Sequence, residues 1–129
     1  MPRRAARGFT LLEVLVAVAI LGVALVTLLG LHVDNLARLA RDQRVSEATL
    51  LAQGLMAEVE AGPVPELGVE RGDFEERYPE RFPGVGWERE VLPTPLADLQ
   101  EVRVRVFHGD GLVPTADDVV LVYYARVAR

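Results

Sequence analysis

The chain has 129 residues, half of them hydrophobic, and its 14 basic and 19 acidic side chains give a net charge of −5. This length suits one small domain, and the negative balance argues against a protein that holds nucleic acid through a global basic surface. Cysteine is absent, which excludes stabilisation by disulfides and any thiol nucleophile.

The most informative stretch is an apolar run near the N-terminus. Residues 14–31 contain no charged side chain, and this is about the length that a helix needs to cross a lipid bilayer. Arg3, Arg4 and Arg7 come just before the run, and such an excess of positive charge keeps its side of the helix in the cytoplasm. We therefore expect one membrane-spanning helix, with residues 32–129 outside.

One acidic residue stands at the start of this apolar run. Glu13 would cost about 2 to 3 kcal/mol if it were deeply buried in the membrane without a partner. It either lies at headgroup depth, where the helix dipole favours a negative charge, or pairs with a positive group. The first interpretation explains neither the glycine at position 8 nor the sharp end of the basic stretch there.

These residues resemble the class III signal of type IV prepilins and pseudopilins, in which a short basic leader ends in glycine before an apolar helix. Here Gly8 is followed by Phe9-Thr10-Leu11-Leu12-Glu13. The resemblance implies that a prepilin peptidase cuts between Gly8 and Phe9 and methylates the new Phe9 amine. It also implies that Glu13 pairs with the Phe9 amine of a neighbouring subunit during assembly, so that one buried charge neutralises another. The spacing of four residues on a helix also allows this pair within one chain.

Two other interpretations of the N-terminus remain open beside the prepilin signal. A plain signal anchor would keep residues 1–8 in the mature protein. A cleaved secretory peptide fits less well, because its apolar core typically has about 7 to 15 residues, and no small-x-small cleavage site follows Leu31 convincingly.

The helical pattern continues beyond the apolar run. Apolar residues at helical spacing form a stripe that the polar turn 41–44 interrupts: Val33, Leu36, Ala40, Ala48, Leu51, Leu55 and Val59. Gly62-Pro63 then provides a stop signal. We expect residues 9–31 in the membrane and residues 32–61 as an amphipathic continuation that packs its stripe on a sheet.

Residues 62–86 are rich in proline, glycine and acidic side chains and are predicted to form a loop. A solvated connection is the favoured interpretation, and a loop that contacts another subunit is the alternative. Phe74, Tyr78 and Phe82 recur every four residues, which predicts a short helical turn tucked onto the domain rather than an aromatic docking patch.

Three strands are predicted in the region 87–129, which we expect to form the sheet. Apolar and polar residues alternate over 86–92 and 101–108, and residues 119–127 are almost continuously apolar. The predicted fold is α+β: a long N-terminal helix, half in the membrane and half amphipathic, packed on a small antiparallel three-stranded sheet. The resemblance implies the same pilin-like architecture.

The inventory of reactive side chains indicates no enzyme. Ser46 is the only serine and lies on the amphipathic helix without a nucleophile elbow, while His32 and His108 are far apart in the sequence. We therefore predict no catalytic residue and no cofactor.

Three acidic residues in the last loop are the one candidate for a metal site. Asp110, Asp117 and Asp118 could present oxygens to calcium, which some major pseudopilins bind. The Asp-x-Asp-x-Asp-Gly order of a calcium loop is missing. Turn-forming, solvated acids are the better interpretation, so no metal site is predicted.

The short cysteine-free chain, with Leu-Leu-Glu-Val-Leu-Val-Ala at the start of its helix, is similar to the I-type pseudopilin of type II secretion and the V-type minor pilin of type IV pili. We expect a minor pilin-like structural subunit needed for pilus assembly or for DNA uptake in natural transformation. The alternatives are a minor pseudopilin of type II secretion and a bitopic, membrane-anchored periplasmic binding module. The sequence does not distinguish the pilus, competence and secretion machines.

The expected partners are the prepilin peptidase, other pilins through the N-terminal helix, and an inner-membrane assembly platform. The expected location is the inner membrane, single-pass, with the C-terminal domain in the periplasm and later in a filament at the envelope or cell surface. Loss of the leader removes three of the 14 arginines and leaves 11 against 19 acids, a net charge of −8. This charge argues against direct binding of nucleic acid, unless Arg103 and Arg105 join an arginine-rich neighbour.

Overall fold

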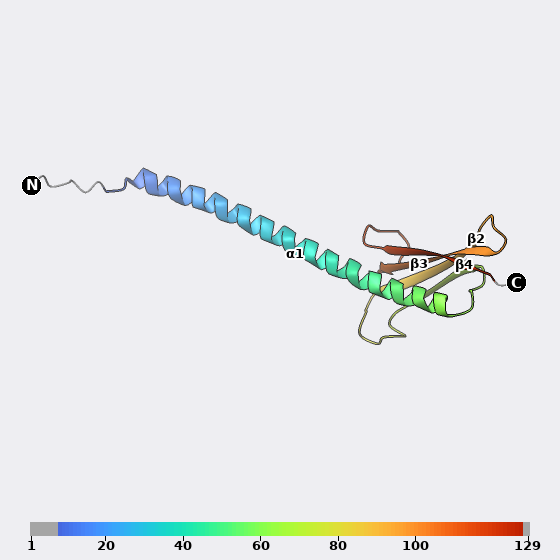
Figure 1. Cartoon of the computed structure of the whole chain (residues 1–129). Helices are drawn as coiled ribbons and strands as arrows, with labels where there is room; N and C mark the ends of the chain where they lie inside the picture. Colours follow the sequence, from blue (N-terminus) through green and yellow to red (C-terminus); the bar gives the residue numbers. More distant parts are fainter. Residues whose placement is uncertain (1–7, 128–129) are drawn as a thin grey trace, which may run out of the picture. The chain divides into compact units, whose positions relative to one another are not determined.

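Residues 8–127 are described by a computed structural model and form one helix and four strands (Figure 1). In chain order these are α1 (Leu11–Ala61), β1 (Gly68–Asp73), β2 (Val85–Pro93), β3 (Leu99–His108) and β4 (Val119–Arg126). The chain divides into two compact units between Ala40 and Arg41, so that α1 contributes to both. Most of the predicted leader, residues 1–7, lies outside the described residues, as do residues 128 and 129.

The helix α1 is continuous over 51 residues. It ends at Ala61 as predicted and begins at Leu11, two residues later than expected. It contains an 18-residue window with a mean hydropathy of 2.9, which is long and apolar enough to cross a membrane. In the first unit, every described side chain up to Ala40 is exposed. Over residues 14–31 that unit therefore presents an apolar surface that no other described part of the chain covers.

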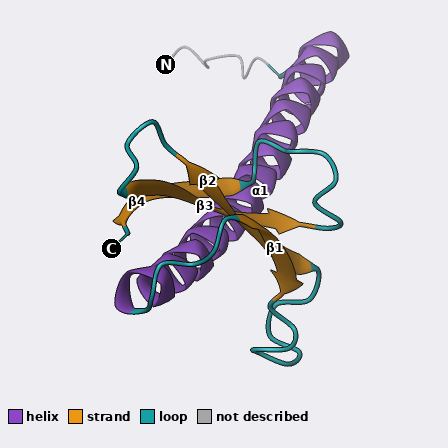
Figure 2. Cartoon of the chain, turned by 90° about the vertical axis from the view of Figure 1, so that its right-hand side faces the viewer, coloured by secondary structure: helices purple, strands orange, loops and turns teal. Residues whose placement is uncertain are grey.

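The four strands form one sheet in the order β1-β2-β3-β4, with every neighbouring pair antiparallel (Figure 2). The part of α1 that belongs to the second unit lies across one face of this sheet. The predicted α+β class, a long helix on an antiparallel sheet, is confirmed.

The predicted number of three strands is wrong, because β1 lies within the segment 62–86 that was expected to be a loop. Its six residues, Gly-Val-Glu-Arg-Gly-Asp, are all exposed. Because the strand buries neither of its faces, its sequence has no alternation of apolar and polar residues from which it could be predicted. The strand is held by backbone pairing with β2 and by cross-strand ion pairs. Arg71 lies 2.5 Å from Glu88, and Arg89 pairs with Glu70.

The core of the second unit forms where α1 meets the sheet. Ala48 and Ala52 are fully buried and belong to one core cluster with the valines of β3. The helix contributes Ala48, Ala52, Leu55, Met56 and Val59, and the rest of the unit contributes Phe74, Val85, Val91, Val102, Val104, Val106 and Ala125. These side chains leave water almost completely, which supplies the main driving force for folding.

The predicted stripe on α1 is therefore correct only in part. Ala48, Leu55 and Val59 are buried as expected, and Leu51 is partly buried. The expectation that the stripe packs along the whole of 32–61 is wrong, because Val33, Leu36 and Ala40 belong to the first unit and stay exposed. Ala52 and Met56, which the prediction omitted, complete the buried face.

The predicted aromatic turn is present between β1 and β2. Phe74 is buried, and its carbonyl accepts the N–H of Tyr78 at 2.8 Å. The ring of Phe82 meets those of Phe74 and Tyr78 edge-on, at centroid distances of 6.5 and 5.6 Å. The turn is thus tucked onto the domain as predicted, although Tyr78 stays partly exposed.

Alanine substitutions at two glycines test the packing, because they are expected to change the free energy of unfolding in opposite directions. A Cβ atom on Gly86 in β2 would lie 2.5 Å from the Phe107 ring, whereas one on Gly54 in α1 would meet nothing within 4 Å. We expect Gly86→Ala to lower the free energy of unfolding by about 1 to 3 kcal/mol through overpacking. Gly54→Ala should raise it by roughly 0.5 to 1 kcal/mol through helix propensity. Chemical denaturation of the full chain in detergent, followed by Trp87 fluorescence, measures both; two shifts of the same sign would contradict this packing.

Candidate functional sites

The side chains considered for catalysis do not form a constellation. Ser46 is exposed on α1, and none of the described hydrogen bonds joins it to a histidine. His32 belongs to the first unit, and His108 ends β3 in the second. A nucleophilic serine requires a base within hydrogen-bond reach, and the described residues supply none to Ser46.

The three acids of the last loop are engaged separately. The carboxylate of Asp110 accepts the N–H of Leu112 at 3.1 Å, which makes it a turn-forming residue as predicted. Asp117 forms an ion pair with Arg41 at 2.6 Å and so ties the loop to α1. Within residues 8–127, no group of three or more His, Asp or Glu side chains is arranged to hold a metal ion.

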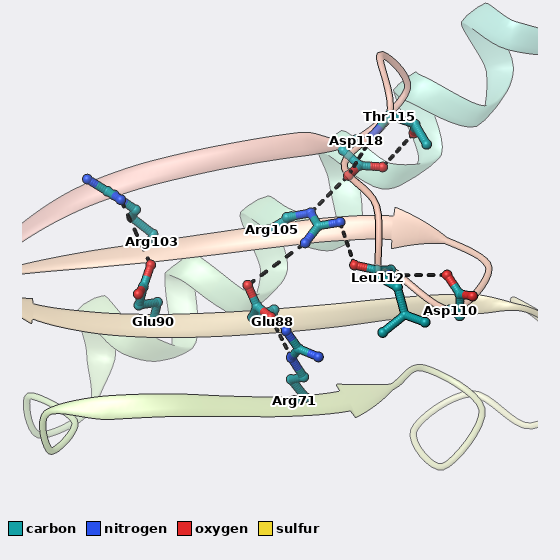
Figure 3. Close-up of polar contacts among 10 residues, drawn as sticks. Arg71, Glu88, Glu90, Arg103, Arg105, Asp110, Leu112, Thr115 and Asp118 are labelled. Atoms are coloured by element: carbon teal, nitrogen blue, oxygen red, sulfur yellow. Dashed lines mark hydrogen bonds and ion pairs between the residues drawn. The ribbon is translucent and has the colours of Figure 1, made fainter.

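Asp118 belongs instead to a polar cluster at the edge of the sheet (Figure 3). Its carboxylate accepts bonds from Nε of Arg105 at 2.8 Å and from the hydroxyl of Thr115 at 2.7 Å. Burial alone would raise the pKa of Asp118, since its side chain is only 6% exposed. The bonds from Thr115 and Arg105 outweigh this effect and hold the pKa below its usual value.

The cluster continues across the outer face of the sheet, the face away from α1. Arg105 lies 3.9 Å from Glu88 in β2, and Glu88 in turn pairs with Arg71 in β1. Arg103, the other arginine considered for nucleic acid, lies 2.5 Å from Glu101 and 3.8 Å from Glu90. Both arginines therefore face carboxylates of their own sheet, which weakens any attraction to phosphate.

The predicted processing site lies just outside the helix. Gly8 and Phe9 precede α1, and both are exposed, Phe9 to 90%. Because α1 begins only at Leu11, the bond between Gly8 and Phe9 is in non-helical backbone, the kind of segment that proteases cut most readily.

Glu13, the predicted assembly residue, takes part in a capping box with Thr10. The carboxylate Oε2 of Glu13 accepts the N–H of Thr10 at 2.9 Å, and the hydroxyl of Thr10 accepts the N–H of Glu13 at 3.3 Å. The two bonds satisfy donors that a helix N-terminus leaves without partners. This role was not among the predictions for Glu13, although the signal Thr-x-x-Glu before an apolar run is present in the sequence.

The capping box bears on the two pairings predicted for Glu13. Within the chain, the donor to its carboxylate is the Thr10 amide rather than the Phe9 nitrogen. The described bond uses Oε2, and a carboxylate can accept further hydrogen bonds on its other oxygen. The geometry thus holds the acid at the helix start and leaves it room for a second donor.

The helix that follows is suited to an apolar environment. The large side chains from Val14 to Leu31 are at least half exposed and apolar. The one hydroxyl in this stretch, Thr27, donates to the carbonyl of Val23 at 2.9 Å and so needs no water. Lipid or other apolar helices can therefore cover this surface without leaving a side-chain polar group unsatisfied.

The Asp118 cluster gives a prediction for pH dependence. An acid whose pKa is lowered in the folded state contributes stability that is complete at neutral pH and is lost as the pH falls through 3.8 and below. We expect Asp118→Asn to lower the free energy of unfolding by about 1 to 3 kcal/mol at pH 7, and the difference from the unmodified chain to shrink towards pH 3. Asp110→Asn, at an exposed turn, is the matched control and should change stability by less than about 0.5 kcal/mol. Denaturation curves measured from pH 7 to pH 3 check this, and a pH-independent difference would contradict it.

Comparison with known proteins gives one match. Residues 3–29 match the family described as the prokaryotic N-terminal methylation motif, which spans most of the predicted leader, Glu13 and most of the apolar run. Neither the curated proteins nor the solved structures gave a match.

This motif contains the residues on which the sequence prediction rested. It implies processing by a prepilin peptidase, and the apolar helix behind it is consistent with an anchor in the inner membrane. Proteins of the pilin family are structural and not enzymatic. The chain therefore carries a prepilin N-methylation motif, the class III signal that indicates the type IV pilin and pseudopilin family.

Proposed function

We propose that this chain is a minor pilin-like structural subunit of a type IV filament machine, needed for pilus assembly or for DNA uptake in natural transformation. The observation that carries the proposal is the methylation motif, which leads without interruption into one helix of 51 residues. The helix is apolar and uncovered over residues 14–31, and its part in the second unit packs on a small sheet. This combination suits a subunit that is anchored in a membrane and then packed among sister helices.

In this proposal the peptidase cuts between Gly8 and Phe9, and the new amine of Phe9 is methylated. The chain stays in the inner membrane with its N-terminus cytoplasmic and its sheet domain in the periplasm. An assembly platform then extracts it into a filament, where neighbouring subunits cover the apolar part of α1. The burial of that surface against other helices replaces its contact with lipid.

The capping box gives the proposed role of Glu13 a physical basis. Both of its partners in the capping box, the amide and the hydroxyl of Thr10, lie after the cleavage site and survive processing. Cleavage adds a positive amine at Phe9 next to a carboxylate that is already fixed at the helix start. A neighbouring subunit's Phe9 amine can then pair with Glu13 without first ordering its side chain, and each charge is neutralised on leaving water.

A minor pseudopilin of type II secretion would use the same anchor, motif and packing, and the similarity to the I-type pseudopilin supports it as the second candidate. The two machines differ in their product. Deletion of the gene should abolish pili or transformation in the first case and the release of secreted proteins in the second.

Substitution of Glu13 tests the proposed assembly step. We expect Glu13→Ala to leave cleavage of the leader largely intact and to reduce recovery in sheared filaments by roughly tenfold or more. The substitution leaves the neighbouring subunit's Phe9 amine without a partner, and an unpaired charge in the membrane costs about 2 to 3 kcal/mol. Thr10→Val removes the capping hydroxyl but keeps the carboxylate, so it serves as the matched variant with the smaller loss. Immunoblots of membranes and of sheared filaments measure both steps.

Two outcomes of this experiment would count against the proposal. Normal recovery of Glu13→Ala in filaments would remove the argument from charge pairing. An unmodified chain that is never cleaved and never found in filaments would favour a membrane-anchored periplasmic binding module instead.

A further inference from the structure

The two edges of the sheet differ in how well they are protected against pairing with another strand. The β1 edge is short, contains two glycines, and its charged side chains at positions 70 and 71 pair with β2. The β4 edge reads Val-Val-Leu-Val-Tyr-Tyr-Ala-Arg and has no charge before its last residue, no proline and no glycine. Natural edge strands normally carry such protective residues, because unpaired strands attract other chains. The β4 edge lacks this protection.

The register shows which backbone groups of β4 are free. The N–H of Val127 donates to the carbonyl of Asp98 at 2.9 Å, which continues the β3–β4 ladder by one pair. In an antiparallel ladder, alternate residues point their N–H and C=O groups to opposite sides. The odd-numbered residues of β4 therefore bond to β3, and Val120, Val122, Tyr124 and Arg126 direct theirs to the open edge.

The same residues carry the exposed side chains of the strand. Val120, Val122 and Tyr124 are 51%, 50% and 55% exposed and point to the outer face, opposite α1. They form a row with a spacing of about 6.8 Å, twice the rise per residue of a strand. Free backbone groups and an apolar row thus lie together, and an added strand can satisfy both at once. Lipid or a helix can cover only the apolar row.

The positively charged Arg126 lies at the end of this row. The strands contain five arginines: Arg71, Arg89, Arg103, Arg105 and Arg126. The first four form ion pairs within the sheet. Arg126, which is exposed, has no ion pair among the described residues. A strand laid along β4 would bring a side chain close to this free guanidinium, so a carboxylate there is favoured.

A second copy of the chain does not provide that carboxylate. Antiparallel pairing of two β4 edges centred on Val122 places Arg126 opposite Asp118, which already accepts bonds from Arg105 and Thr115. Registers shifted by one pair or two place Arg126 opposite Val120 or Val122 in one direction and opposite Ala116 or Pro114 in the other, and none of these is acidic. On the β1 edge the only acid of the outer face is Asp73, the last residue of that strand. Antiparallel pairing that places Arg126 opposite Asp73 leaves the rest of β4 opposite the turn that follows β1, so the two strands hardly overlap.

We propose that the free edge of β4 receives a fifth strand from a different polypeptide. The added segment is extended, bears β-branched or aromatic side chains against Val120, Val122 and Tyr124, and carries a carboxylate opposite Arg126. This inference goes beyond the proposed function, because it depends neither on cleavage of the leader nor on which machine the chain serves.

The test uses the full chain in its own cells, with the photoreactive p-benzoylphenylalanine in place of Tyr124. Irradiation should join this position to another polypeptide, and mass spectrometry of the adduct identifies the attached segment. Val122→Lys places a charge in the row and should lower the adduct yield about tenfold, the loss that about 1.4 kcal/mol of binding free energy produces. Val69→Lys is the matched control on the β1 edge, where the valine is 59% exposed, and should leave the yield unchanged.

Two further readouts make the result decisive. Arg126→Glu should reduce the yield through repulsion of the proposed carboxylate, and thermal unfolding of each variant shows that the fold is kept. No adduct, an adduct to lipid or to a second copy of the chain, or equal losses for Val122→Lys and Val69→Lys would each overturn the proposal. Leader cleavage, read from the same samples, tests the proposed function separately.

Discussion

The packing of α1 on the valines of β3 is the contact on which the rest of the structure depends. Ala48 and Ala52 lie in one core with Val102, Val104 and Val106, and all five side chains are fully buried. This contact determines which part of a single long helix belongs to the folded domain. The helix before Arg41 contributes nothing to that core and must be covered by something other than the domain.

One helix therefore serves two environments, and its residues change accordingly. Over residues 14–31 the side chains are apolar and uncovered, the one hydroxyl of that stretch, at Thr27, is satisfied within the helix, and the acid that precedes it, Glu13, is held by the capping box. In the second unit one face is buried and the other is charged. The methylation motif places a processing signal directly before this helix. The proposed function follows from that combination, since cleavage exposes an amine beside a carboxylate that is already ordered.

The sequence predicts those elements whose apolar residues are regularly spaced or continuous. The amphipathic half of the helix, β2 and β3 were identifiable because apolar side chains recur at helical or alternating spacing, and the first half of the helix and β4 because they are almost continuously apolar. The strand β1 was not, because all its residues are exposed and it is held by backbone pairing and by partners such as Glu88, which is 17 residues away from Arg71. The Asp118 cluster was equally hidden, since no local pattern indicates that Arg105 lies beside it. The capping box was readable from Thr10 and Glu13 and was overlooked.

The measurement that tests the account most directly is the intact mass and N-terminal sequence of the protein purified from its own membranes. The account predicts a chain that begins at Phe9, with a methyl group on its amine. A chain that still begins at Met1 or Pro2 while a working prepilin peptidase is present would contradict it. The leader would then act only as a topology signal, and the sheet domain would need a separate explanation.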